Sequence, residues 1–168
     1  YLELDIMNMT LETETIPVVS FGVNKGEWKY TESYIKIDDA FKMIADISFS
    51  PEYIDNFSDP LFLFLNINVN ENEQTLDKIH DSLRRIFGYR LLGKMYHHQK
   101  MNIALESMCN FMGKVVIMVQ SSFKGYKINQ LINCSLDDRY LRRGTISELN
   151  SIQKMSGKKL KPSFSIKS

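Results

Sequence analysis

The feature that most constrains the fold is a pair of short, continuous apolar runs with an amphipathic helix pattern between them. The runs are Leu61–Leu65 and Val115–Val119, and apolar residues recur at helical spacing across Thr75–Phe87. A strand that is apolar at every position is typical of a parallel sheet buried on both faces. Parallel strands need a crossover connection, which is usually a helix. The chain is therefore expected to be an α/β protein.

Two strands and one helix are predicted before the first apolar run. Leu2–Ile6 alternates apolar and polar residues with the period of a strand, and Ile16–Val19 is a short β-branched run. Ile37–Ile47 has helical spacing, and its first turn carries the acids Asp38 and Asp39, which the helix dipole favours there. We expect the four strands to lie parallel in one curved sheet with both helices on its outer face. Either a doubly wound sheet or a barrel satisfies this order of elements.

The remainder of the chain is predicted to be less regular. Leu105–Met112 has the pattern of a short helix that Gly113 ends, and Ile128–Leu136 is a candidate fifth strand. Residues 136–168 end in a lysine-rich stretch without periodicity, so we expect an extension outside a domain of residues 1–135.

Composition excludes some classes of function. The formal net charge is +1, so no overall field favours nucleic acid. No apolar run approaches the length of about eighteen residues that a membrane span needs. Neither GxGxxG nor GxxxxGK[ST] occurs, which weighs against a nucleotide-binding doubly wound fold. Frequent Ile, Lys and Asn are typical of A/T-rich genomes, including those of large DNA viruses.

Glu3 and Asp5 are the most suggestive pair of polar residues. Positions i and i+2 of a strand point to one side, so the two carboxylates could bind a hard cation such as Ca²⁺. The alternative is an exposed strand face with ordinary acidic residues, and the spacing alone favours this alternative. Asn66 lies where a buried strand becomes polar, and the sequence alone favours its interpretation as part of a polar strand end.

The histidines and cysteines carry no recognisable motif. His97 and His98 lie in a polar stretch without a nearby acid, which indicates a solvated loop, and His80 is expected on a helix flank. Cys109 and Cys134 stand in apolar contexts without CxxC spacing, which favours buried thiols over a disulfide or a metal site.

In their order and spacing, several segments resemble the X region of phosphatidylinositol-specific phospholipase C and related phosphodiesterases. They are YLELDIM, PVVSFG, IKIDDAFKMIADISF, DPLFLFLN, the helix with IFGYRLL, and GKVVIMV, and they span most of residues 1–120. The resemblance implies a partial TIM-like (β/α) barrel whose first strand, with the first catalytic histidine, would precede Tyr1. In active members two histidines act at the carboxyl ends of the strands, and eukaryotic-type members add Ca²⁺.

Only some of the family's site residues are present at the matching positions of this sequence. Glu3 and Asp5 match the acidic pair of the family's E-L-D motif, which implies a vestigial metal site. Phe21 occupies the position of a family histidine, and a phenyl ring cannot transfer a proton. Asn66 replaces a family glutamate.

The family's phosphate-contacting lysines fall on Met118 and Gln120, so no substrate-binding residue is expected. Loss of one acid/base group costs a factor of about 10²–10⁴ in rate. Together the replacements imply no catalytic residues and no required cofactor, with Ca²⁺ expected only if activity persists.

The favoured function is a catalytically degenerate phospholipase C-like domain that acts as a structural or protein-binding module, with a virion or capsid as one setting. Its partners would be other proteins of an assembly, inside a cell or a virion. The alternative is a divergent, cation-dependent phosphoric diester hydrolase acting on phosphatidylinositol-type lipids. A third hypothesis is a lipid binder without chemistry, for which the basic tail allows weak contact with anionic membranes.

Overall fold

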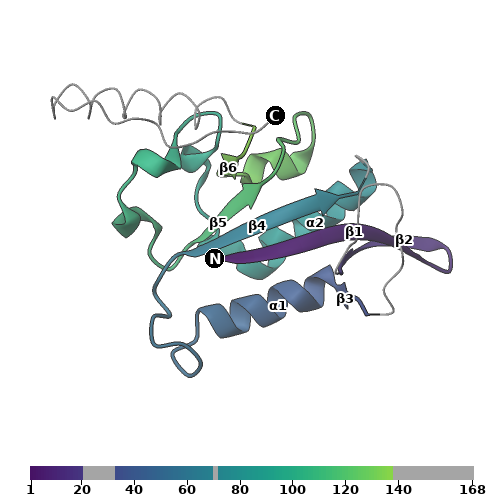
Figure 1. The fold of residues 1–168 in the computed structure, drawn as a ribbon, viewed down its shortest axis with the longest axis horizontal. Helices are drawn as coiled ribbons and strands as arrows, with labels where there is room; N and C mark the ends of the chain where they lie inside the picture. The colour runs from purple at the N-terminus through teal and green to yellow at the C-terminus, as the bar shows by residue number, and fades with distance from the viewer. Residues whose placement is uncertain (21–32, 70–71, 138–168) are drawn as a thin grey trace, which may run out of the picture. The chain divides into compact units, whose positions relative to one another are not determined.

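The computed structural model of the chain describes residues 1–20, 33–69 and 72–137, which form a β-sheet with two α-helices (Figure 1). The strands are β1 (Leu2–Leu11), β2 (Glu14–Val19), β3 (Ile35–Lys36), β4 (Leu61–Asn68), β5 (Val115–Val119) and β6 (Cys134–Ser135). The α-helices are α1 (Ile37–Ser48) and α2 (Glu73–Phe87). Over these described ranges the sheet has six strands in the order β3-β2-β1-β4-β5-β6.

The centre of the sheet is parallel, as the apolar runs predict. β1 pairs in parallel with β4, β4 with β5, and β5 with the two-residue β6. Within the described residues the sheet is open, with β3 and β6 at its edges. The observed fold class is mixed α/β, and the partial barrel stays a prediction of the resemblance.

The prediction that Ile16–Val19 lies parallel to the other core strands is wrong, because β2 runs antiparallel to β1. Only Glu12 and Thr13 separate the two strands. A connection of two residues makes a hairpin, whereas a parallel pair needs a crossover of about a dozen residues or more. Glu12 has a φ of 53°, the left-handed conformation that tight hairpin turns require.

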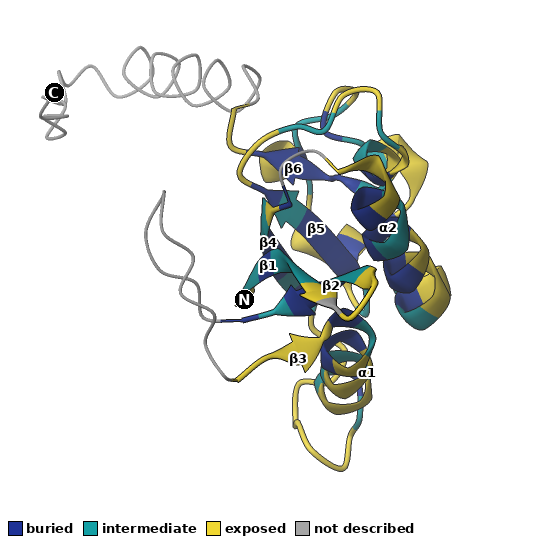
Figure 2. Ribbon diagram, turned by 90° about the vertical axis from the view of Figure 1, so that its right-hand side faces the viewer, coloured by how far each residue is buried: buried dark blue, intermediate teal, exposed yellow. Residues whose placement is uncertain are grey.

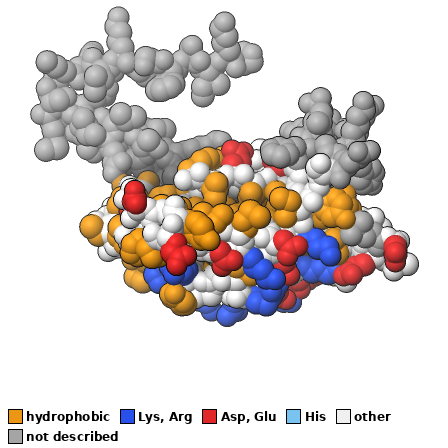
Figure 3. Space-filling view, turned by 90° about the horizontal axis from the view of Figure 1, so that it is seen from below, with side chains coloured by type: hydrophobic (Ala, Val, Ile, Leu, Met, Phe, Trp, Pro, Cys, Tyr) orange, Lys and Arg blue, Asp and Glu red, His pale blue; other side chains and the backbone are white. Residues whose placement is uncertain are grey.

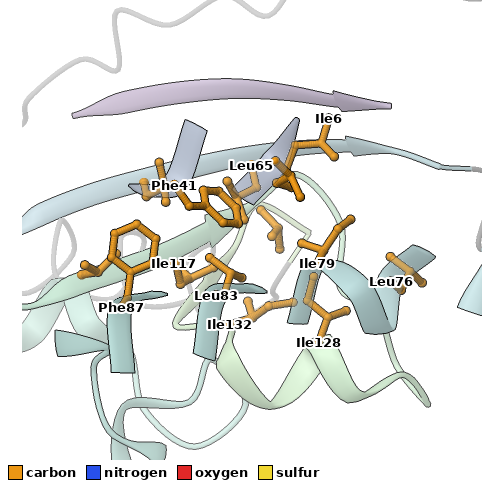
Figure 4. Packing of buried hydrophobic residues seen from close by; sticks show 14 of the residues in the cluster. Ile6, Phe41, Leu65, Leu76, Ile79, Leu83, Phe87, Ile117, Ile128 and Ile132 are labelled. Atoms are coloured by element: carbon orange, nitrogen blue, oxygen red, sulfur yellow. The ribbon is translucent and has the colours of Figure 1, made fainter. Parts of the chain in front are cut away.

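Both α-helices lie on one face of the sheet (Figure 2). A doubly wound sheet carries helices on both faces, so the placement of these two helices does not match that alternative. The core between helices and sheet is built by Ile6, Leu65 and Ile117 from the strands and by Leu83 and other apolar residues of α2 (Figure 4).

The two predicted α-helices are confirmed with small changes of their ends. α2 begins at Glu73, where the side chain of Asn72 accepts a hydrogen bond from the Thr75 backbone N–H at 3.0 Å. Such a side-chain cap satisfies one of the free donors of the first turn. The rings of Phe41 on α1 and Phe87 on α2 lie 5.6 Å apart, so the two helices also pack against each other.

The predictions for residues 105–136 are mostly wrong. The expected helix Leu105–Met112 is replaced by two short 3-10 helices, Ile103–Leu105 and Met108–Phe111. The side chains of Asn102 and Ser107 accept from backbone N–H groups two residues on, which restarts the chain at each point.

The expected strand Ile128–Leu136 consists of a 3-10 helix, Lys127–Leu131, and the short β6. The predicted C-terminal extension lies outside the described residues, apart from Leu136 and Asp137. No helix in the described part of the chain is both long and apolar enough to cross a membrane.

Candidate functional site

Glu3 and Asp5 on β1 and Asn66 on β4 point to the face of the sheet opposite the helices. Their chain neighbours Leu4 and Leu65 pack with the helix-side core, and successive side chains of a strand point to opposite faces. The parallel register aligns Asp5 directly with Asn66. Glu3, Asp5 and Asn66 therefore lie together on this face.

One amide group joins the two carboxylates. The Asn66 Nδ2 atom donates to Glu3 Oε1 at 2.7 Å and to Asp5 Oδ1 at 3.0 Å. Ionised carboxylates only accept hydrogen bonds, so the nitrogen end of the amide must face them. The amide nitrogen thus lies at the point on which both carboxylates converge.

The second oxygen of Glu3 is also in use. The Tyr1 hydroxyl donates to Glu3 Oε2 at 3.2 Å. Desolvation, this hydrogen bond and the negative charge of Glu3 all raise the pKa of the Tyr1 hydroxyl. Both oxygens of Glu3 therefore accept hydrogen bonds from side chains of this chain.

This arrangement does not fit a Ca²⁺ ion. Ca²⁺ takes about six to eight oxygen ligands, several of them usually charged. The cluster offers two carboxylates, and Asn66 turns its nitrogen toward them. Within the described residues, no group of three or more His, Cys, Asp and Glu side chains could hold a metal ion.

The surroundings of the acidic pair are apolar where the resemblance leads one to expect lysines. Phe64 is aligned with Glu3 on one side and with Met118 on the other, and all three share one face of the sheet. Phe64 is buried, and its ring centroid lies 6.5 Å from that of Tyr1. Gln120 follows β5 directly and is exposed. This part of the face can bury apolar groups, and its side chains bring no positive charge to a phosphate.

Phe21, the residue at the position of a family histidine, lies outside the described residues. Its neighbour Ser20 is buried, and its backbone N–H donates to the carbonyl oxygen of Asp5 at 3.2 Å. The chain therefore reaches the side of Asp5 just before position 21.

The expectation of a solvated loop at His97 and His98 is wrong. His98 is only 3% exposed, and the two rings lie 4.4 Å apart. His97 Nε2 lies 2.8 Å from the backbone oxygen of Asn129, and His98 Nε2 lies 3.2 Å from the Asn129 side-chain oxygen. The polar residues around the two histidines suggested exposure to solvent. Their partner Asn129 is more than thirty residues away in the sequence, so no local pattern could reveal it.

The remaining candidates are His80 and the two cysteines. His80 is buried in α2, and its Nδ1 lies 2.9 Å from Asp81 Oδ1. Both cysteines are free thiols, and Cys134 is buried as predicted. Cys109 is exposed, contrary to prediction, because the 3-10 helix Met108–Phe111 buries Phe111 instead.

Fold and site together define a mixed α/β protein with an acidic pair that is hydrogen-bonded to an amide on the sheet face opposite the helices. Among solved structures, the crystal structure of L. pealei PLC21 is similar to this chain, with a TM-score of 0.47 and 15% sequence identity. The match covers 96% of this chain and 17% of that one, so the chain spans less than a fifth of that protein's length. No protein-family model matches the sequence, and no curated protein matches it.

Proposed function

We propose that this chain is a catalytically degenerate phospholipase C-like domain, part of a (β/α) barrel, that serves as a structural or protein-binding module. The observation that carries the proposal is the Asn66 amide bound to both Glu3 and Asp5. A neutral donor in this place satisfies the two carboxylates without a cation. The pair is then a structural element of the sheet rather than a metal site.

The residues around the pair support the same function. Phosphodiester cleavage needs groups that move protons and groups that balance negative charge. Phe64 and Met118 lie where such groups would help, and neither can ionise or donate a hydrogen bond. The chemistry that these side chains favour is packing against another surface.

Exposed hydrophobic side chains give the domain a surface for such packing. The face seen from below in Figure 3 carries a band of hydrophobic side chains, with acidic and basic side chains intermixed beside it. Among the described residues, α1 and the loop after it carry five exposed hydrophobic residues, Met43, Ile47, Tyr53, Ile54 and Phe57. Contiguous exposed apolar surface is typical of protein interaction sites.

The test is an assay of the protein on phosphatidylinositol in the presence of Ca²⁺, together with calorimetric titration of Ca²⁺. We expect no turnover and no binding in the micromolar range. Turnover that Glu3→Ala abolishes, or micromolar Ca²⁺ affinity that Asp5→Asn abolishes, would overturn the proposal.

One observation favours the alternative, a divergent cation-dependent phosphoric diester hydrolase. Glu3 and Asp5 both lie within hydrogen-bond distance of one atom, so the two carboxylates are already gathered at one point. The same assay separates the two functions, because only the hydrolase gives turnover that depends on Glu3.

A virion or capsid is the setting that we propose for the module, on the strength of the Ile, Lys and Asn usage. Peptides of this chain should then be found by mass spectrometry in purified virus particles. Their absence from particles, with the protein present in the infected cell, would exclude this setting.

A further inference from the structure

A second polar site lies in the segment that holds the two adjacent histidines. Lys94, His97, Gln99, Lys100 and Gln130 line a hollow of about 280 Å³, which we call the lysine pocket. Four of its residues belong to the 3-10 helix Lys94–Tyr96 and the turn after it, and Gln130 comes from the 3-10 helix Lys127–Leu131. None of these residues takes part in the site of Glu3, Asp5 and Asn66.

Four of the five lining side chains, those of Lys94, Gln99, Lys100 and Gln130, can donate hydrogen bonds to a ligand, and no carboxylate lines the pocket. The ion pairs found among the described residues involve neither Lys94 nor Lys100. A hollow of about 340 Å³ between β2, α1 and α2 differs in this respect, because its Lys78 pairs with Glu14 at 2.7 Å and its Arg85 pairs with Asp38 at 2.6 Å. The lysine pocket therefore carries two positive charges that no carboxylate of its own lining balances, and it also has amide donors.

The wall of the pocket is held in place by hydrogen bonds within and between its two segments. His97 Nε2 donates to the backbone oxygen of Asn129, since a carbonyl oxygen can only accept, and His97 Nδ1 accepts from the Gln99 backbone N–H at 3.3 Å. The neighbouring His98 is buried and contacts the Asn129 side chain. The backbone N–H of Lys100 donates to the His97 carbonyl oxygen at 2.8 Å, which fixes the turn that carries both lysines.

From this geometry we propose that the lysine pocket binds a phosphate group. The pocket is lined by two ammonium groups and two side-chain amides, which match the charge and the acceptor oxygens of a phosphate. The volume is below the roughly 300–1,000 Å³ of pockets that enclose drug-sized ligands. It suits a phosphate on a small molecule or on a lipid headgroup, and the two sources share the same chemistry.

Titration of inorganic phosphate into the ¹⁵N-labelled chain, followed by amide chemical shifts, tests the pocket. We expect shifts at residues 94–100 and 130, with affinity at least about tenfold weaker in the double variant Lys94→Gln/Lys100→Gln. The matched control is Lys42→Gln/Lys124→Gln, which removes two exposed lysines elsewhere and should bind like the unsubstituted protein. Spectra that change only near the substituted residues establish that both variants are folded.

Equal weakening in the two double variants would overturn the proposal, because binding would then follow total charge alone. A lack of any shift at residues 94–100 in the unsubstituted protein would overturn it as well. Failure here leaves the degenerate phospholipase C-like function untouched, since that function rests on Glu3, Asp5 and Asn66.

Vesicles separate the two sources of the phosphate. Phosphatidylcholine vesicles with and without phosphatidic acid are sedimented with the protein and with the Lys94→Gln/Lys100→Gln variant. Sedimentation that needs both phosphatidic acid and the two lysines supports a lipid headgroup. Phosphate-induced shifts without sedimentation support a soluble phosphate compound. Sedimentation that is unaffected by the variant, with no phosphate-induced shifts, would contradict the pocket.

Discussion

Asn66 on β4 and Asp5 on β1 are direct neighbours across a parallel strand pair, and the Asn66 amide donates to Asp5 Oδ1 at 3.0 Å. The same nitrogen donates to Glu3. Two carboxylates that would otherwise repel each other are thus held by one neutral side chain. The identity of residue 66 decides whether this face of the sheet is stable without a cation.

The substitution Asn66→Asp tests this relationship. It replaces the shared donor with a third carboxylate, so at neutral pH we expect the free energy of unfolding to fall by about 1–3 kcal/mol. The loss should shrink near and below pH 4, where carboxylates become protonated. Ca²⁺ should restore part of the stability, because a cation that binds only the folded state stabilises it. Urea denaturation at several pH values, with and without Ca²⁺, measures each effect.

Asn68→Asp is the matched control, because Asn68 is exposed on the same strand and the same face two residues later. It should change the free energy of unfolding by less than about 0.5 kcal/mol and give no response to Ca²⁺. If the two variants lose the same stability, Asn66 does not act through Glu3 and Asp5.

The acidic pair could be found from sequence because it depends on strand period alone. Residues i and i+2 of a strand share a face, so Glu3 and Asp5 had to lie together. The bridging amide could not be found in the same way, because it depends on the register between β1 and β4. A shift of that register by one residue would turn Asn66 to the other face.

The fold shows the same division. The apolar runs Leu61–Leu65 and Val115–Val119 predicted parallel central strands, since burial on both faces leaves no other pattern. The direction of β2 was missed because the predicted strands, Leu2–Ile6 and Ile16–Val19, stop short of the two-residue turn that joins β1 to β2. The lysine pocket was missed because Gln130 reaches it from a segment thirty residues away from the lysines.

Asn133 holds the outer side of β5, and its removal should be costly. Its buried side chain accepts from the Ile117 backbone N–H at 2.9 Å and donates to the Tyr96 carbonyl oxygen at 3.2 Å. Asn133→Ala leaves the buried N–H of Ile117 without this acceptor, so we expect a loss of about 1–3 kcal/mol in the free energy of unfolding. Urea denaturation against the control Asn110→Ala, an exposed asparagine, measures it. Equal stabilities of the two variants would show that water or a backbone shift replaces the bond.

Asp38 connects the first turn of α1 to α2 and should make stability depend on pH. Burial raises the pKa of its carboxyl, but hydrogen bonds from Ser82 and Arg85 and the positive charge of Arg85 outweigh burial and hold the pKa below its ordinary value. A depressed folded-state pKa contributes stability above the unfolded-state pKa of about 3.9, and this contribution is lost as pH falls through the folded-state value. Asp38→Asn should therefore be less stable at pH 7 by at most about 1 kcal/mol, because the Arg85–Asp38 pair is about half exposed to solvent, and the difference should vanish in acid.

The control for that substitution is Asp39→Asn. Asp39 is exposed in the same first turn, so both substitutions remove a charge that the helix dipole favours. If the free energy of unfolding depends less on pH in Asp38→Asn than in Asp39→Asn, the difference is due to the contacts of Asp38 with Ser82 and Arg85. Identical pH profiles for the two variants would assign the effect to the dipole alone.

Leu83 tests whether the helix-side core carries the stability of the domain. It is fully buried on α2 within the cluster that joins α2 to β4 and β5. Leu83→Ala removes three heavy atoms from a close-packed site, so we expect a loss of about 2–5 kcal/mol in the free energy of unfolding. Arg84→Ala changes the next, exposed residue of the same helix and should cost less than about 1 kcal/mol, mainly through the helix dipole. Urea denaturation with unchanged m-values measures both losses. A loss below about 1 kcal/mol for Leu83→Ala would mean that the core between α2 and the sheet is loosely packed and that the contacts around Asn66 and Asn133 carry more of the fold.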